Sequence, residues 1–273
     1  MRHPARKTLR VTASLLALLA VAACGDDEEE DIDALAQKNE SVDVLYNRAR
    51  ETYAERGYKQ AIEEFEEVER QHPYSEWAAR GQIMAAYSAY KAGQYDDAIS
   101  ILDRFVKLHP AHASTPYAYY LKALCSYIQI VDVGRDQKMT ETARGALREV
   151  VERYPDSEYA RDAKLKLDLT DDHLAGKEME IGRYYLRRDE YISAANRFQY
   201  VVDHYQTTSH TPEALHRLVE VNLRLGLTEE AKKYAAVLGY NFPGSEWYQY
   251  SYAMMEGNLS PEEKKSFTDF LTP

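Results

Sequence analysis

The sequence predicts an all-α fold built from repeated pairs of helices. Its main signal is an alanine that recurs five times, each time twelve residues ahead of a position where a helix is expected to end. A small residue lets a neighbouring helix approach closely, and proline cannot continue a helix, so the pattern describes the second helix of a two-helix repeat. The five pairs are Ala61 and Pro73, Ala98 and Pro110, Ala143 and Pro155, Ala194 and Gln206, and Ala231 and Pro243.

The same second helices carry further residues in register with the alanine. A tyrosine lies three residues before it in three units, and a large apolar residue lies four residues after it in four units. We expect the apolar residues to form the core of each pair. The tyrosines are Tyr58, Tyr95 and Tyr191, and the apolar residues are Phe65, Leu102, Leu147 and Phe198.

Three of the helix-ending prolines open the next unit with a shared phrase of proline, serine, glutamate and an aromatic residue. The phrase occupies residues 73–77, 155–159 and 243–247. Serine is a favourable N-cap, and an acidic residue is favourable in the first turn of a helix. We therefore expect Ser75, Ser157 and Ser245 to cap helices, with the aromatic residue buried behind each cap.

The alanines are 37, 45, 51 and 37 residues apart. The first and last steps resemble the tetratricopeptide repeat of about 34 residues. The extra residues of the second step indicate a longer loop over residues 133–138, and those of the third an elongated helix through residues 164–177. The predicted fold is therefore a tetratricopeptide-repeat solenoid of about five repeats, with the long helix between repeats three and four.

Residues 1–23 read as a secretory signal, with basic residues ahead of an apolar run that ends at Ala23. The run is too short to span a bilayer, which needs about 20 residues. The small residues before Cys24 resemble a bacterial lipoprotein processing site, at which Cys24 becomes the N-terminus and carries N-acyl (palmitate) and S-diacylglycerol chains. Gly25 then favours the outer membrane by resemblance to sorted lipoproteins. The alternative is an ordinary signal peptide that leaves Cys24 free.

The mature chain is strongly acidic. Its net charge is −11 with the signal; residues 1–23 contain four basic residues, so removal leaves 34 − 4 = 30 Lys and Arg against 45 Asp and Glu, or −15. Such a surface disfavours nucleic acid as a partner. We expect an acidic tether over residues 24–40, repeats one to three over 41–157, repeats four and five over 158–245, and a capping helix with a tail over 246–273.

No catalytic constellation is present, so the sequence predicts a protein that is not an enzyme. There is neither a glycine-rich phosphate loop nor a nucleophile elbow. His72 and His109 occupy equivalent places before a proline, which favours helix capping over metal binding. Cys125, the one thiol besides Cys24, suits a buried apolar position. We expect no metal and no cofactor other than the lipid.

Tyrosine is abundant, at 23 of 273 residues. In the alanine register, several tyrosines and two arginines fall at or beside the inner side of the first three repeats, where solenoids bind extended partners. Aromatic rings with guanidinium groups suit a peptide that has large apolar side chains and a terminal carboxylate. The alternative is that these rings pack helix on helix. The predicted groove residues are Arg50, Tyr53, Arg80, Tyr87, Tyr90, Tyr117, Tyr120 and Tyr127.

Several segments resemble the BamD family, the lipoproteins of the β-barrel assembly machinery. The most specific is Asp-Arg-Phe-Val-Lys-Leu-His-Pro-Ala-His at residues 103–112, together with the lipid-attachment cysteine. Others are Gly-Arg-Asp-Gln at 134–137, Arg-Tyr-Pro-Asp-Ser at 153–157, Tyr-Tyr at 184–185 and Ala-Asn-Arg at 195–197. The resemblance covers about residues 20 to 243, and the tail beyond Gly244 shows little of the pattern.

The resemblance implies a lipid-anchored scaffold on the periplasmic face of the outer membrane, working with other lipoproteins of the complex. Family members bind periplasmic domains of BamA through their C-terminal repeats, where Asn196 and Arg197 match. Their N-terminal repeats are thought to receive the targeting strand of unfolded outer-membrane proteins. The alternative is a tetratricopeptide lipoprotein that serves pilus secretins or peptidoglycan assembly.

Overall fold

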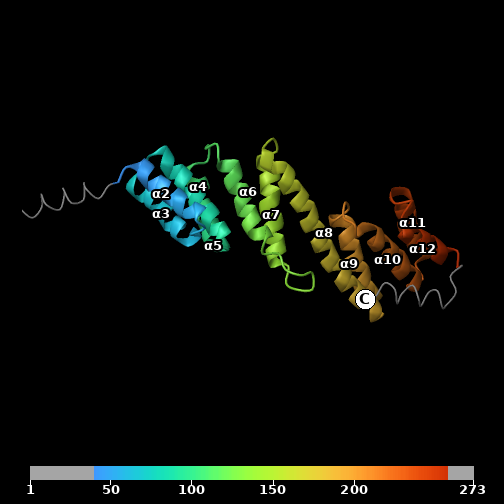
Figure 1. Ribbon diagram of the computed structural model, residues 1–273. Coiled ribbons are helices and arrows are strands. Elements are labelled where there is room, and N and C mark those ends of the chain that lie inside the picture. The colour runs from blue at the N-terminus through green and yellow to red at the C-terminus, as the bar shows by residue number, and fades with distance from the viewer. Residues whose placement is uncertain (1–39, 258–273) are drawn as a thin grey trace, which may run out of the picture. The chain divides into compact units, whose positions relative to one another are not determined.

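The computed structural model describes residues 40–257, and this part of the chain consists of eleven helices without a strand (Figure 1). The predicted all-α class is confirmed. The signal, Cys24, the acidic tether up to residue 39 and the tail from residue 258 lie outside the described residues. The helices are α2 (Val42–Ala54), α3 (Tyr58–Gln71), α4 (Glu76–Lys91), α5 (Tyr95–Leu108), α6 (Thr115–Tyr127), α7 (Lys138–Arg153), α8 (Glu158–Arg187), α9 (Tyr191–His204), α10 (Thr211–Arg224), α11 (Thr228–Asn241) and α12 (Glu246–Met255).

The described part of the chain divides into two compact units, one that ends at Ser88 and one that begins at Ala89, so the division falls within α4. In the first unit, the ring of Tyr46 lies between Phe65, at 5.5 Å, and Trp77, at 4.7 Å. Helices α3 and α4 approach closely where Gly81 meets the backbone of Phe65. The predicted grouping of the repeats at residue 157 stays a prediction.

The alanine register correctly predicts the buried face of the second helices. Ala61, Ala98, Ala143, Ala194 and Ala231 have no exposed surface and lie on α3, α5, α7, α9 and α11. Each of these helices ends two residues before its predicted stop. The backbone of Tyr205, before Gln206, has φ −131° and ψ 42°, close to the −131° and 57° of His72 before proline. The turn therefore keeps its form without proline.

The serine caps are only partly as predicted. The Ser75 hydroxyl accepts a hydrogen bond from Ala78 N at 3.1 Å, and that of Ser245 accepts one from Trp247 N at 3.2 Å. Ser157 occupies the N-cap position of α8 but accepts no such bond. Its hydroxyl donates to the Tyr154 carbonyl at 2.8 Å, as the Ser75 hydroxyl donates to the His72 carbonyl at 2.9 Å. The aromatic residues behind the serines are half-buried, because each lies at the edge of its helix pair.

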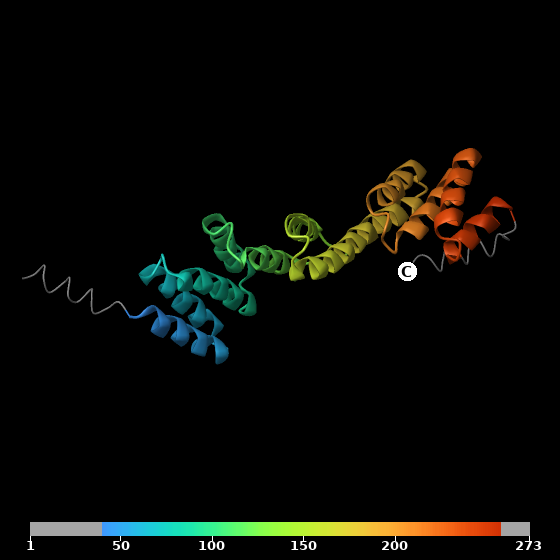
Figure 2. The same cartoon turned by 90° about the horizontal axis from the view of Figure 1, so that it is seen from above.

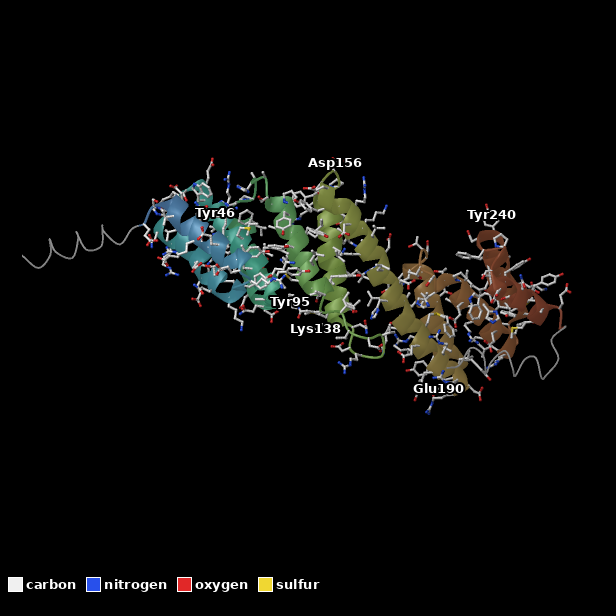
Figure 3. All side chains as sticks on the ribbon, viewed as in Figure 1. Tyr46, Tyr95, Lys138, Asp156, Glu190 and Tyr240 are labelled. Atoms are coloured by element: carbon white, nitrogen blue, oxygen red, sulfur yellow. The ribbon has the colours of Figure 1, made fainter. Side chains whose placement is uncertain are left out.

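The elongated helix is confirmed as α8, which has 30 residues and is about 45 Å long (Figure 2). Its first half packs against α7 and its second half against α9. Figure 3 labels Lys138 at the start of α7, Asp156 in the turn between α7 and α8, and Glu190 in the turn between α8 and α9. None of the described helices is long and apolar enough to cross a membrane.

Candidate partner-binding site

The predicted groove residues of the first unit form a small aromatic cluster. The Tyr53 ring lies 5.9 Å from that of Tyr87 and 5.5 Å from that of Tyr58. Burial, and then the neighbouring Tyr87, raise the pKa of Tyr53. The Arg80 guanidinium lies 5.2 Å from the Trp77 ring, and Arg50 is exposed. The structure thus brings the two tyrosines together and places Arg80 on an indole ring.

The remaining groove residues lie in the second unit, where they pack helix against helix. Tyr117 and Tyr120 on α6 both contact Tyr159 on α8, with ring centroids 5.4 and 5.3 Å apart. The Tyr127 ring lies 5.8 Å from the Lys166 ammonium. Tyr90 contacts Tyr95 at 5.9 Å.

One carboxylate stands among these rings. Asp162 accepts hydrogen bonds from the Tyr120 hydroxyl and from Lys166 Nζ, the latter at 2.7 Å. The hydrogen bonds from Lys166 and Tyr120 lower the pKa of Asp162, while burial and Asp162 raise the pKa of Tyr120. Lys166 is therefore already engaged, and a peptide carboxylate would meet the Asp162 charge there. Peptide binding in this groove stays a prediction.

The residues predicted for partner binding, Asn196 and Arg197, lie together at an open pocket of the second unit. The pocket has a volume of about 290 Å³. Helix α8 contributes one aromatic wall and α9 contributes the rest. The lining residues are Tyr185, Ser193, Asn196, Arg197 and Tyr200.

The position of this pocket is set by a close contact between α8 and α9. A β-carbon on Gly182 would lie 2.8 Å from Cδ1 of Phe198, so the ring seats directly on the glycine. Phe198 has no exposed surface. Arg197, the preceding residue, then meets Glu178 one turn earlier on α8, and Nη1 donates to Oε2 at 3.0 Å. The Arg197 side chain is nevertheless 44% exposed, against 19% for Glu178.

The pocket combines polar donors with aromatic walls. A guanidinium, an amide and a hydroxyl can all donate hydrogen bonds, from Arg197, Asn196 and Ser193 respectively. Tyr200 is 42% exposed, and its ring stacks on His204 with centroids 4.0 Å apart. Such an arrangement suits a carboxylate next to an apolar group, because guanidinium binds carboxylates strongly and the rings cover apolar surface.

One protein-family model matches most of the chain. The model of the YfiO family, described as "Outer membrane lipoprotein", matches residues 38–238. The chain belongs to the YfiO family. The match includes every helix from α2 to α10 and most of α11.

Curated relatives of this YfiO family chain are named "Outer membrane protein assembly factor BamD". That of Caulobacter vibrioides is 49% identical over 246 residues, which cover 90% of this chain and 80% of the relative. That of Rickettsia prowazekii is 43% identical over 250 residues, 92% of this chain and 98% of the relative. That of Neisseria meningitidis serogroup A is 34% identical and covers 90% of this chain and 95% of the relative.

Among solved structures, the TPR domain of P58(IPK) is similar to the chain at a TM-score of 0.42. The sequence identity is 15%, and the similarity covers 88% of this chain and 71% of the other.

A ladder of ion pairs on α10 of this YfiO family member is buried, and that burial was not predicted from the sequence. Arg217 and Glu220 are 2% and 1% exposed, and their side chains are joined by a 2.8 Å hydrogen bond. Arg217 also lies 3.5 Å from Glu213, and the Trp247 ring of α12 is 5.9 Å from its guanidinium. Two further ion pairs extend this ladder. Arg183 of α8 donates to Glu213 at 3.1 Å, and Arg224 donates to Glu220 at 2.6 Å. It links α8, α10 and α12.

A histidine is buried beside this ladder. His216 Nδ1 lies 2.8 Å from the Ser251 hydroxyl of α12, and the imidazole has no exposed surface. Burial, and then the Arg217 charge, lower the pKa of His216 to about 3. The side chain is therefore neutral at physiological pH.

The Gly-Arg-Asp-Gln segment forms an ordered loop between α6 and α7. The buried Gln137 amide donates to the carbonyls of Asp132, Val133 and Arg135 at 3.0 to 3.2 Å. Lys177 of α8 donates to the Gly134 carbonyl at 3.2 Å. The longer loop is confirmed between residues 128 and 137, although α7 already begins at Lys138.

The candidate metal and thiol positions show no reactive arrangement in the described part of the chain. Across residues 40–257, no group of three or more His, Cys, Asp or Glu side chains is arranged to hold a metal ion. Cys125 is buried, and burial raises the pKa of its thiol to about 12. A thiol with such a pKa is a poor nucleophile.

Proposed function

We propose that the chain is a non-enzymatic scaffold for the assembly of outer-membrane proteins, and that it binds the periplasmic domains of BamA through Asn196 and Arg197. Membership of the YfiO family and the names of the curated relatives support the general role. The proposal places the partner contact on the pocket between α8 and α9. Other lipoproteins of the machinery and unfolded outer-membrane proteins complete the proposed set of partners.

The exposure of the Arg197 guanidinium at the pocket is the observation that supports the proposed partner contact. Its guanidinium is 44% exposed at the pocket, although Glu178 already accepts one of its hydrogen bonds. A guanidinium has five N–H donors, so several remain for a carboxylate of the partner. Loss of one member of a desolvated ion pair typically costs about 2 to 5 kcal/mol of binding free energy.

The test is Arg197→Glu, assayed by the dissociation constant for the periplasmic domains of BamA. We expect strong weakening, because the change reverses the charge that meets the partner's carboxylate. Arg161→Glu is the matched control, since Arg161 is exposed on α8 and remote in sequence from the pocket. Equal affinities of Arg197→Glu and wild type, with helical content retained in both, would refute the contact.

We also propose that lipid on Cys24 holds the chain on the periplasmic face of the outer membrane. The short apolar run ahead of Cys24 and the YfiO family description support this anchor. Cys24→Ala should shift the protein from the membrane fraction to the periplasmic fraction without loss of helical content. A variant that still sediments with outer membrane at high salt would contradict lipid anchoring.

A further inference from the structure

We propose that Glu178 is a positioning residue for the partner site and holds the Arg197 guanidinium at the mouth of the pocket. The inference rests on the proposed function, because it concerns how Arg197 meets BamA. It adds a residue that lies outside the pocket lining.

The two side chains differ in a way that assigns their roles. Glu178 is 19% exposed and is absent from the pocket lining, whereas Arg197 is 44% exposed and belongs to it. Glu178 thus lies behind the guanidinium, with Arg197 between it and the open space. Only Nη1 of Arg197 donates to Glu178, at 3.0 Å.

The physical effect of such a support is on conformational entropy. A long arginine side chain loses rotamer freedom when it is fixed in a complex, and a side chain already held in place loses less on binding. The supporting carboxylate also lies on a rigid element. Glu178 is one turn before Gly182, where Phe198 seats α9 on α8, so the distance between the two side chains is set by backbone packing.

The same helix provides a matched control. Glu180 lies two residues further along α8, is 51% exposed and pairs with Lys177 at 3.3 Å. Removal of Glu180 changes the net charge as removal of Glu178 does, but leaves the Arg197 contact in place. The two variants therefore separate positioning from the general charge of the surface.

The experiment is a double-mutant cycle on the full-length protein, with the periplasmic domains of BamA as the probe and calorimetry as the readout. We expect Glu178→Ala to raise the dissociation constant on the order of tenfold, because the Arg197 side chain regains rotamer freedom that it must then lose on binding. Glu178→Gln keeps an oxygen that accepts the Nη1 hydrogen bond and should restore most of the affinity. Glu180→Ala should bind as wild type.

The cycle also separates positioning from a general effect on folding. In an Arg197→Ala background, Glu178→Ala should cause no further loss, because Glu178 acts only through the guanidinium. An equal loss in both backgrounds would overturn positioning, and so would wild-type affinity of Glu178→Ala when Arg197→Ala loses binding. Wild-type affinity of Arg197→Ala would instead overturn the proposed contact itself, and the inference with it. Thermal unfolding of each variant shows whether the fold is retained.

Discussion

Phe198 seats its ring on Gly182. A β-carbon at that glycine would lie 2.8 Å from Cδ1 of the ring, and the ring has no exposed surface into which it can move. This contact fixes α9 on α8 and brings Arg197 beside Glu178. The buried Gly182 thus determines the position of the partly exposed Arg197.

Gly182→Ala is expected to destabilise the second unit. The added methyl group overlaps the Phe198 ring, and overpacking of a core costs about 1 to 3 kcal/mol. Replacement of glycine by alanine within a helix recovers roughly 0.5 to 1 kcal/mol, so overpacking prevails. Denaturant unfolding measures the difference.

The control for this substitution lies on α7. A β-carbon on Gly145 would meet nothing within 4 Å, so Gly145→Ala should raise the free energy of unfolding through helix propensity alone. Stabilisation by both substitutions would show that Phe198 repacks freely and that the contact does not fix α9.

Arg217→Ala is expected to be strongly destabilising. It leaves Glu220, which is 1% exposed, without one of its two arginine partners. Removal of one partner of a buried ion pair costs about 3 to 5 kcal/mol, and Arg224 should hold the loss near the lower value. Urea unfolding provides the measurement.

Two comparisons test the cause of that loss. Arg217→Met combined with Glu220→Leu removes both buried charges and should be less destabilising than Arg217→Ala alone. Lys232→Ala breaks the surface pair with Glu229, whose side chain is 81% exposed, and should leave the unfolding midpoint unchanged. A double variant less stable than the single variant would mean that the charges themselves stabilise α10.

His216 is expected to make stability depend on pH. Its pKa is about 3 in the folded chain, against 6.5 for an ordinary histidine, so between these pH values the unfolded chain binds a proton that the folded chain does not. The free energy of unfolding that His216 contributes should therefore be present above pH 6.5 and be lost as the pH drops toward 3. Between pH 7 and pH 5, His216 should account for a loss of about 2 kcal/mol.

The measurement compares the free energy of unfolding of wild type and His216→Gln at these two pH values. Glutamine keeps a group that can hydrogen-bond to Ser251 but does not titrate. The difference between the two proteins should shrink by about 2 kcal/mol at pH 5. A constant difference would mean that the buried imidazole does not couple to folding.

The sequence predicts the helix pairs well, because their signals are local. Alanine and proline at a fixed offset mark the buried face and the end of each second helix, and the structure has both at Ala61 and Gln71. The elongated helix follows from residues 164–177, which are polar and free of proline. Asn196 and Arg197 were placed by resemblance, and the structure adds that they share one pocket.

Features that depend on tertiary contacts could not be predicted in this way. Glu213, Arg217, Glu220 and Arg224 have the i, i+3 and i, i+4 spacing of a solvated charged face, and only the covering helices bury it. The pattern of alternating charge was visible, but its burial was not. Ser157 stands in the same phrase of proline, serine, glutamate and an aromatic residue as Ser75, and both hydroxyls donate to the carbonyl three residues back. Only the Ser75 hydroxyl also accepts a hydrogen bond from a backbone N–H of the first turn. A short motif does not determine the geometry of the first turn closely enough to predict this bond.

The length of α8 has one more consequence. The step from Ala143 to Ala194 exceeds the step from Ala61 to Ala98 by 51 − 37 = 14 residues. At about 100° per residue, fourteen residues turn a helix through almost four whole turns and fall short by only about 40°. The insertion therefore lengthens α8 while the faces before and after it keep nearly the same direction. A single added residue in the same stretch would rotate everything beyond it, the contact between Gly182 and Phe198 included, by about 100° relative to α7. The faces of α8 before and after the insertion therefore keep their direction only when the added length is close to a whole number of turns.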